Sequence, residues 1–231
     1  MTHSIHFGSK EIQFNLSYSE RKSLGITVTP DMEVLVKAPI DATIDKILEK
    51  VKKKAAWIIK QQAFFLSFQP KMPERRYVSG ETHLYLGRQY RLQISIGDNE
   101  VVMHRGSFIE VITKEKSKAG ELLKKWYRLK ANEKFAIIAQ PLIERFKKHD
   151  KEPSGLFIQD MPTRWGSCTT KGKIILNPEL IKAPRHCIEY VIIHELCHLI
   201  HHNHTQKFID LQTREMPDWE KWKNKLESLL A

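Results

Sequence analysis

Cysteine is scarce in this sequence, and the count excludes a disulfide framework. The three cysteines are Cys168, Cys187 and Cys197, an odd number confined to the last third of the chain. Small secreted proteins that depend on disulfides carry an even and denser set. We therefore expect free thiols and a protein of the reducing cytoplasm.

Long apolar runs are also missing. No stretch approaches the roughly 20 apolar residues that a membrane-spanning helix needs. The first ten residues, MTHSIHFGSK, lack the apolar core of a secretory signal peptide. The sequence predicts neither a membrane span nor export.

Signatures of phosphate and nucleic-acid binding are absent as well. There is no glycine-rich phosphate loop, helix-turn-helix or zinc-finger spacing. The formal net charge of +11 nevertheless allows contact with polyanions. Much of this charge lies in two lysine-rich stretches, 50–54 and 124–134, on expected helices whose polar faces are solvated. We therefore expect only weak, non-specific nucleic-acid binding.

What remains is the composition of an ordinary globular protein, with 231 residues of which 41% are hydrophobic and 28% charged. Apolar and polar residues alternate over 11–38 and 82–113, which predicts two groups of strands. Apolar residues repeat at helical spacing over 43–66 and 119–149, which predicts a helix in each. Pro141 is expected to kink or divide the second helix. The pattern indicates a mixed α+β protein.

The most informative stretch is the sequence HELCH at 194–198. Two histidines four residues apart share one helix face, so the rings of His194 and His198 can bind one metal ion. Apolar residues at 190–193 place the motif on a buried helix. The pattern predicts a catalytic zinc site in which Glu195 acts as general base towards a water molecule.

Catalytic zinc takes three protein ligands and one water, and several later residues could supply the third ligand. His201 and His202 would lie about 10 Å or more along a straight helix from the first ligand, too far for bonds of about 2 Å. Asn203 tolerates the left-handed conformation that ends many helices, and His204 follows it directly. The spacing favours His204, with Glu215 as the alternative.

Residues 164–177 have the pattern of two short strands joined by a tight turn, which predicts a hairpin. Beside the metal helix, such a hairpin could align an extended peptide. Arg164 at its start could stabilise an oxyanion or bind a phosphate, or it could form a surface salt bridge. Arg164 is therefore a candidate catalytic residue.

With these residues in view, the chain resembles the YgjP-like family of zinc metallopeptidases, which is related to SprT-type domains. The resemblance covers nearly the whole chain. Its most specific parts are RWGSC at 164–168, the Leu-Asn pair at 176–177, HELCH at 194–198 and the Asn-His pair at 203–204. Where the family often has a Phe-Trp pair, this chain has Phe208 followed by Ile209.

The resemblance implies zinc bound by His194, His198 and His204, with Glu195 as the catalytic acid and base. It also implies an α+β architecture. In that architecture a zincin-like catalytic domain, residues 119–231, follows a β-rich domain with one long helix, residues 1–118.

Three substrate classes stay open at this point. The first is a peptide or protein cleaved by a zinc metallopeptidase. The second is a nucleoside triphosphate hydrolysed by a metal-dependent pyrophosphatase, an activity also proposed within the family. The third is a protein associated with DNA, as for SprT-like proteases. The resemblance does not decide between them, and we favour the first.

Overall fold

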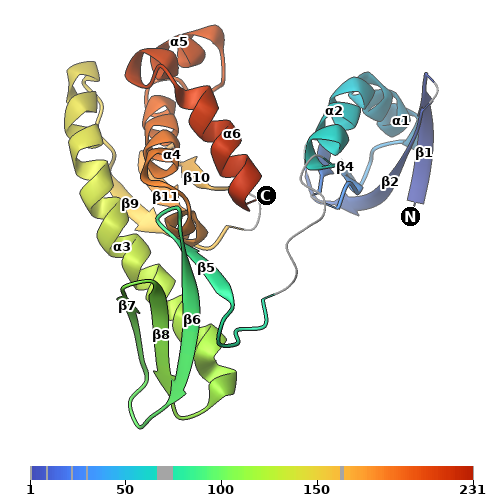
Figure 1. The fold of residues 1–231 in the computed structure, drawn as a ribbon. Helices are drawn as coiled ribbons and strands as arrows, with labels where there is room; N and C mark the ends of the chain where they lie inside the picture. Colours follow the sequence, from blue (N-terminus) through green and yellow to red (C-terminus); the bar gives the residue numbers. More distant parts are fainter. Residues whose placement is uncertain are drawn as a thin grey trace. The chain divides into compact units, whose positions relative to one another are not determined.

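A four-stranded sheet forms first along the chain. The computed structural model, drawn in Figure 1, describes residues 2–8, 10–21, 23–29, 31–66, 75–161 and 164–230. The strands β1 (Thr2–Phe7), β2 (Lys10–Ser19), β3 (Gly25–Val28) and β4 (Val34–Pro39) lie in the order β1-β2-β4-β3. The central pair, β2 and β4, is parallel, and the two outer pairs are antiparallel. Ile12, Phe14 and Leu16 of β2 are buried between exposed residues, as the alternation predicts.

Two helices, α1 (Ile44–Lys53) and α2 (Ala55–Leu66), share the hydrophobic core of this sheet. The single helix predicted over 43–66 is thus interrupted at Lys54. The backbone N–H of Lys54 donates to the carbonyls of both Lys50 and Val51, which tightens the turn at this point. The sheet and both helices belong to one compact unit, Met1–Pro73.

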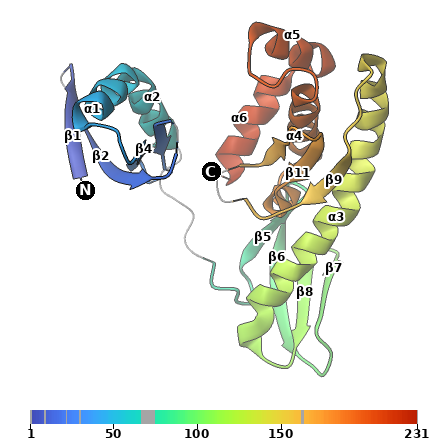
Figure 2. The same ribbon diagram turned by 180° about the vertical axis from the view of Figure 1, so that it is seen from behind.

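A second unit, Glu74–Leu230, contains the remaining elements. Its first sheet has the strands β5 (Thr82–Tyr85), β6 (Arg88–Ile96), β7 (Val101–Arg105) and β8 (Phe108–Thr113), in the order β5-β6-β8-β7. This sheet packs against α3 (Ala119–Phe146), which runs along the whole unit in Figures 1 and 2. Tyr85, Leu92, Ile109 and Val111 lie in the same core as Trp126 of that helix.

The expected division at residues 118 and 119 therefore differs from the one observed at 73 and 74. Backbone bonds explain the difference, because the turn after β5 is tied to the C-terminal half of the chain. The N–H groups of Leu86 and Gly87 donate to the carbonyls of Ile181 and Lys182. Gly87 has a φ of +77°, and a Cβ there would lie 2.7 Å from the ring of Pro184, so glycine permits this contact.

The second sheet of this unit has three strands and also lies against α3. Its strands are β9 (Gly155–Ile158), β10 (Gly166–Cys168) and β11 (Lys173–Leu176), in the order β10-β11-β9. β10 and β11 form the antiparallel hairpin predicted over 164–177, and β9 runs parallel to β11. β10 is therefore an edge strand among the residues that the structure describes.

The C-terminal helices complete this unit. They are α4 (Arg185–His198), α5 (Gln206–Glu215) and α6 (Trp219–Leu230), with short 3-10 turns η1 (Lys116–Lys118), η2 (Lys147–His149) and η3 (Pro178–Lys182). The Pro141 residue lies inside α3 without dividing it. Pro184 precedes α4 at its N-cap, and nine side chains of α4 are buried, as expected for a helix surrounded by other elements. The fold is mixed α+β, and no described helix is long and apolar enough to cross a membrane.

Candidate metal centre

Three histidine rings converge at the C-terminal end of α4. His194 and His198 stand one turn apart on this helix, and His204 follows in the segment that leads to α5. One nitrogen of each ring lies within 4.8 Å of the others, so the three side chains could hold a metal ion. The structure thus brings together the three histidines that the sequence spacing favours as ligands.

The distances between these rings fit a tetrahedral metal ion. Nε2 of His194 and Nε2 of His204 are 3.1 Å apart. Two nitrogens bound to one tetrahedral zinc at about 2.0–2.1 Å would be separated by about 3.3 Å. Imidazole is also a ligand that zinc prefers. The residues present therefore fit a zinc ion.

The turn after α4 allows His204 to reach the other two rings. The N–H groups of Leu199 and Ile200 donate to carbonyls three residues back, on Leu196 and Cys197, and this tightens the last turn. The prediction of a left-handed conformation at Asn203 is wrong, because Asn203 is not among the described non-glycine residues with a positive φ. The described non-glycine residues with positive φ are Met32, Tyr77, Leu86 and Asp150. The helix ends in a 3-10 turn instead.

The two candidate ligands on α4 are each oriented by a hydrogen bond at the second ring nitrogen. Nδ1 of His194 donates to Oε1 of Gln212 at 2.8 Å, and Nδ1 of His198 donates to the carbonyl of His201 at 3.2 Å. A proton on Nδ1 leaves the lone pair on Nε2, where a metal would bind. Burial lowers the pKa of His194 to about 4 and also lowers the pKa of His198, so both rings are neutral at neutral pH.

An apolar ring forms the base of the site. Phe208 on α5 is fully buried, and its ring centroid lies 5.0, 4.6 and 4.7 Å from those of His194, His198 and His204. Packing against one rigid ring restricts the rotation of all three imidazoles. The departure from the family's Phe-Trp pair at Ile209 leaves this contact intact.

The other residues that competed for the third-ligand position lie elsewhere. His201 contributes its backbone carbonyl, and His202 lines the cleft outside the ligand group. Glu215 is buried at the end of α5 and binds a different set of side chains. Its carboxylate lies 2.8–3.2 Å from nitrogens of Arg145, Lys148 and His149. These contacts join α5 to the end of α3.

Replacing Glu215 by Gln should lower the free energy of unfolding by roughly 1.5–3 kcal/mol, the value of hydrogen bonds to charged groups. Burial raises the pKa of Glu215, but its bonds to Lys148 and His149 outweigh this and hold the pKa below the usual value. The carboxylate therefore stabilises the fold above its unfolded-state pKa of about 4.3, and the effect is lost as pH falls through the lower folded-state pKa.

Denaturant unfolding of the Glu215→Gln variant at neutral pH and at acid pH measures this difference. The exposed Glu220→Gln change on α6 is the matched control and should have little effect. A Glu215→Gln variant as stable as the wild type at neutral pH would contradict the anchoring role.

Glu195 lies beside the edge strand β10. Burial raises the pKa of Glu195 to about 7, although the backbone N–H of Cys168 donates to the carboxylate and the charge of Arg164 attracts it. A Cβ at Gly166 would lie 2.7 Å from Oε1 of Glu195, so only glycine lets β10 pass this close. A carboxyl with a pKa near neutrality suits proton transfer at neutral pH.

These groups face a common cleft with a volume of about 480 Å³. One wall comes from the start of the hairpin and the other from α4 and the residues after it. The lining residues are Arg164, Trp165, Gly166, Ser167, Cys168, Tyr190, Val191, His194, Glu195, His198, His202 and His204. The structure places Arg164 at this cleft with an exposed side chain.

The edge of β10 offers backbone groups for pairing. The carbonyl of Trp165 accepts from the N–H of Asn177, and the N–H of Thr169 donates to the carbonyl of Lys173, so both groups face β11. Pairing alternates in an antiparallel ladder, so the backbone groups of Gly166 and Cys168 point to the free edge. Glu195 already uses the N–H of Cys168. The N–H and carbonyl of Gly166 and the carbonyl of Cys168 could pair with an extended chain.

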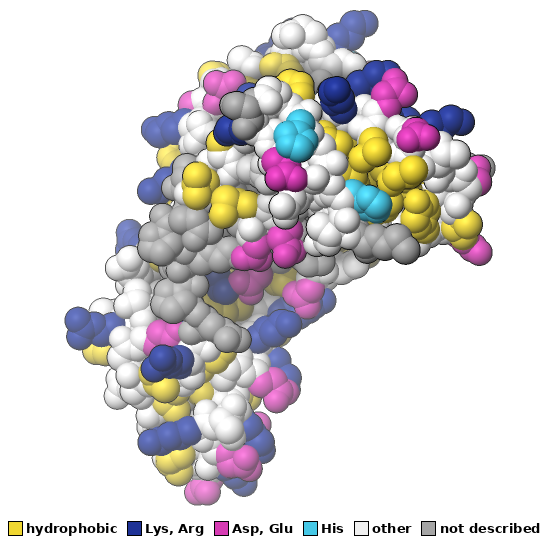
Figure 3. Space-filling view, turned by 90° about the vertical axis from the view of Figure 1, so that its right-hand side faces the viewer, with side chains coloured by type: hydrophobic (Ala, Val, Ile, Leu, Met, Phe, Trp, Pro, Cys, Tyr) yellow, Lys and Arg dark blue, Asp and Glu magenta, His cyan; other side chains and the backbone are white. Residues whose placement is uncertain are grey.

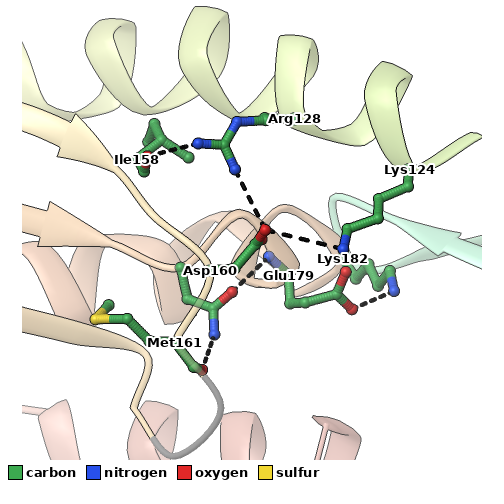
Figure 4. A network of polar contacts seen from close by, with 8 residues as sticks. Lys124, Arg128, Ile158, Asp160, Met161, Glu179 and Lys182 are labelled. Carbon is green, nitrogen blue, oxygen red and sulfur yellow. Dashed lines mark hydrogen bonds and ion pairs between the residues drawn. The ribbon is translucent and has the colours of Figure 1, made fainter. Parts of the chain in front are cut away.

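A buried amide fixes the approach to β10. Nδ2 of Asn177 donates to the carbonyls of Met161 and Arg164 at 2.7 and 3.0 Å. Figure 4 shows the neighbouring contacts, in which Arg128 and Lys124 of α3 reach towards Asp160. Asn177 thus holds the backbone of Arg164 at the start of the hairpin, and Asp160 is joined to the long helix.

Sequence reasoning did not single out Gly166, Asn177 or Gln212 for these roles. Gly166 and Asn177 lie in or next to the segments that carry the resemblance, which is the signal that could have found them. Gln212 gives no such signal, because its contact with His194 depends on how α5 packs against α4.

Comparison with known proteins is consistent with this geometry. A protein-family model described as "YgjP-like, metallopeptidase domain" matches residues 22–229. The matched segment covers most of the chain and includes every residue of the histidine group. No curated protein matches the chain.

Proposed function

The chain belongs to the YgjP-like metallopeptidase-domain family, and from this premise we propose that it is a zinc metallopeptidase. The observation that carries the proposal is the arrangement of three metal-competent histidines and Glu195 in one cleft beside an edge strand. Zinc is proposed because three imidazoles fit its ligand preference and catalytic geometry. The second unit would then contain a zincin-like catalytic domain.

In the proposed mechanism His194, His198 and His204 would hold the zinc ion. When bound, zinc would polarise the substrate carbonyl and make water a stronger acid. Glu195 accepts a proton from the attacking water and passes it to the leaving amine. Its elevated pKa, about 7, suits both transfers. Arg164, at the cleft, is proposed to stabilise negative charge that develops on the substrate.

The edge strand supports a peptide as substrate. An extended peptide can pair with exposed backbone groups, which aligns its scissile bond without requiring a particular sequence. β10 has such groups on Gly166 and Cys168, directly beside Glu195. All three cysteines are free, which agrees with the proposed cytoplasmic setting.

One observation favours a second candidate, a nucleoside triphosphate pyrophosphatase. The guanidinium of Arg164 at the same cleft is a phosphate-binding group, and a metal ion could polarise a phosphoryl oxygen instead of a carbonyl. The same Glu195 would serve as base. The two candidates therefore differ in substrate and not in the catalytic residues.

One activity panel separates these candidates. Zinc-loaded protein is incubated with unfolded proteins, peptide libraries and each nucleoside triphosphate, with chelated protein as the control. Mass spectrometry detects new peptide termini, and a coupled assay detects pyrophosphate. New termini that depend on zinc are the expected result. Pyrophosphate release without new termini would overturn the peptidase in favour of the second candidate.

We also expect nucleic-acid binding to be weak. Many basic side chains of α3 are paired with acids. The pairs are Lys124 and Arg128 with Asp160, Lys125 with Glu121, and Lys130 with Glu133. On the face shown in Figure 3, lysine and arginine side chains are interspersed with acidic ones. In the first unit Lys50, Lys53 and Lys54 line a hollow with Trp57, but Lys53 pairs with Glu49.

Dissociation constants of about 10⁻⁴ to 10⁻⁶ M at physiological salt are therefore expected for DNA, with no sequence preference. Titrations of labelled single- and double-stranded DNA at several salt concentrations measure them, and the peptidase assay is repeated with and without DNA. Sub-micromolar binding at physiological salt, or peptidase activity that appears only with DNA, would favour a DNA-associated SprT-like protease instead.

A further inference from the structure

Gln212 is a buried polar side chain that contacts a candidate metal ligand from a different helix. Its side chain is on α5 and only 1% of the residue is exposed. Oε1 of Gln212 lies 2.8 Å from Nδ1 of His194. Burying an amide is unfavourable unless it is hydrogen-bonded, so this contact needs a physical reason.

The two ends of the amide have different consequences for His194. With the carbonyl end facing the ring, Nδ1 holds the proton and Nε2 is free to bind a metal. The NH₂ end would instead take Nδ1 as acceptor and leave the proton on Nε2, which faces His204. Nε2 of Gln212 has no partner among the described residues, so the amide makes its one described side-chain bond at the carbonyl end.

Helix α5 holds Gln212 in place from both sides. One turn before it, Phe208 packs on the three imidazoles, and three residues after it Glu215 is bound by Arg145 and Lys148 of the segment that ends α3. These three residues of α5 are all buried, so they lie on the face that meets the core. The side-chain carbonyl of Gln212 is therefore presented to His194 by a helix that is also anchored at Glu215, away from the candidate ligands.

We propose that Gln212 is a positioning residue of the metal centre. It fixes the Nδ1-protonated tautomer and the ring orientation of His194, so that Nε2 points to the ion. The corresponding bond of His198 is to the backbone carbonyl of His201, which no side-chain change removes. Gln212 is thus a side chain through which metal affinity can be changed without replacing a ligand. This inference rests on the metal centre of the proposed function.

Three variants test the proposal. Gln212→Met removes the acceptor and keeps the length, and Gln212→Glu keeps an oxygen acceptor. Gln206→Met is the matched control on α5, because Gln206 is exposed and bonds Asp210. Zinc affinity is measured by competition with a chelator, and the visible spectrum of the cobalt-substituted protein reports the coordination geometry. Loss of such an orienting partner typically weakens metal affinity about 10- to 100-fold.

We expect zinc affinity to fall by this amount in Gln212→Met, to return towards the wild-type value in Gln212→Glu, and to be unchanged in Gln206→Met. Wild-type affinity in Gln212→Met, or equal weakening in both Gln212 variants, would overturn the positioning role. A wild-type protein that binds no zinc would overturn the proposed metal centre itself, so the two failures are distinguishable.

A measurement on the wild-type protein does not depend on the variants' folding. Nitrogen-15 NMR of the zinc-loaded protein locates the proton on each histidine ring. A proton on Nδ1 of His194, protected from exchange with water, supports the proposal. A proton on Nε2 of His194, or rapid exchange at Nδ1, would overturn it.

Discussion

Glu195→Gln should lose hydrolytic turnover by about 10²- to 10⁴-fold, the usual contribution of a general base. The amide has nearly the same shape as the carboxylate but cannot accept the proton of the attacking water. Glu195 is not in the ligand group, so the variant should bind zinc as the wild type does. Turnover and bound zinc are measured on the same preparation, by the activity assay and by atomic emission.

Glu189→Gln is the matched control for this change. Glu189 lies on the same helix, and Arg185 pairs with it at 2.8 Å, away from the candidate ligands. This control should retain both zinc and turnover. Wild-type turnover in Glu195→Gln would contradict the hydrolytic mechanism for either substrate class. Loss of zinc in Glu195→Gln would show that the residue supports the metal rather than the chemistry.

Replacing His194 or His198 should abolish zinc binding. Two remaining histidines leave a catalytic zinc short of its usual three protein ligands, so bound zinc should fall from about one per chain to nearly none in His194→Ala and His198→Ala. His204→Ala should weaken binding strongly. His204 is exposed and lies on a loop, whereas the other two candidate ligands are on a rigid helix.

The neighbouring histidines provide controls of the same chemistry. His201→Ala keeps the backbone carbonyl that orients His198, and His202 lies outside the ligand group, so both variants should retain zinc. Retention of full zinc in His204→Ala, together with loss in Glu215→Ala, would reassign the third ligand. Loss of zinc in His201→Ala would show that one of its ring nitrogens competes for the ion.

Part of this centre could be predicted from the sequence because it depends on local geometry. The four-residue spacing of His194 and His198 fixes their shared helix face, and the rise of a helix makes His201 and His202 too distant. The structure agrees, since α4 ends at His198 and His204 approaches within 3.1 Å of His194. The hairpin that contains β10 was also local, because its two strands are joined by a short turn.

Other features depend on contacts between distant segments and could not be predicted. The division into units follows from the bonds of Leu86 and Gly87 to residues near position 181, which no local pattern encodes. In the sequence, Gln212 is an ordinary polar position of a short helix, and Glu215 is a candidate ligand rather than an anchor of that helix. Their roles arise because α5 packs its buried face between the candidate metal ligands and the end of α3.

Anomalous X-ray diffraction at the zinc absorption edge, on crystals of the zinc-loaded protein, would test the three-histidine centre most directly. We predict one strong anomalous peak per chain, with Nε2 of His194, His198 and His204 each about 2.0–2.1 Å from it and Glu195 outside bonding distance. A peak bound by Glu215 or Cys168, or the absence of a peak between the three rings, would contradict the proposed centre.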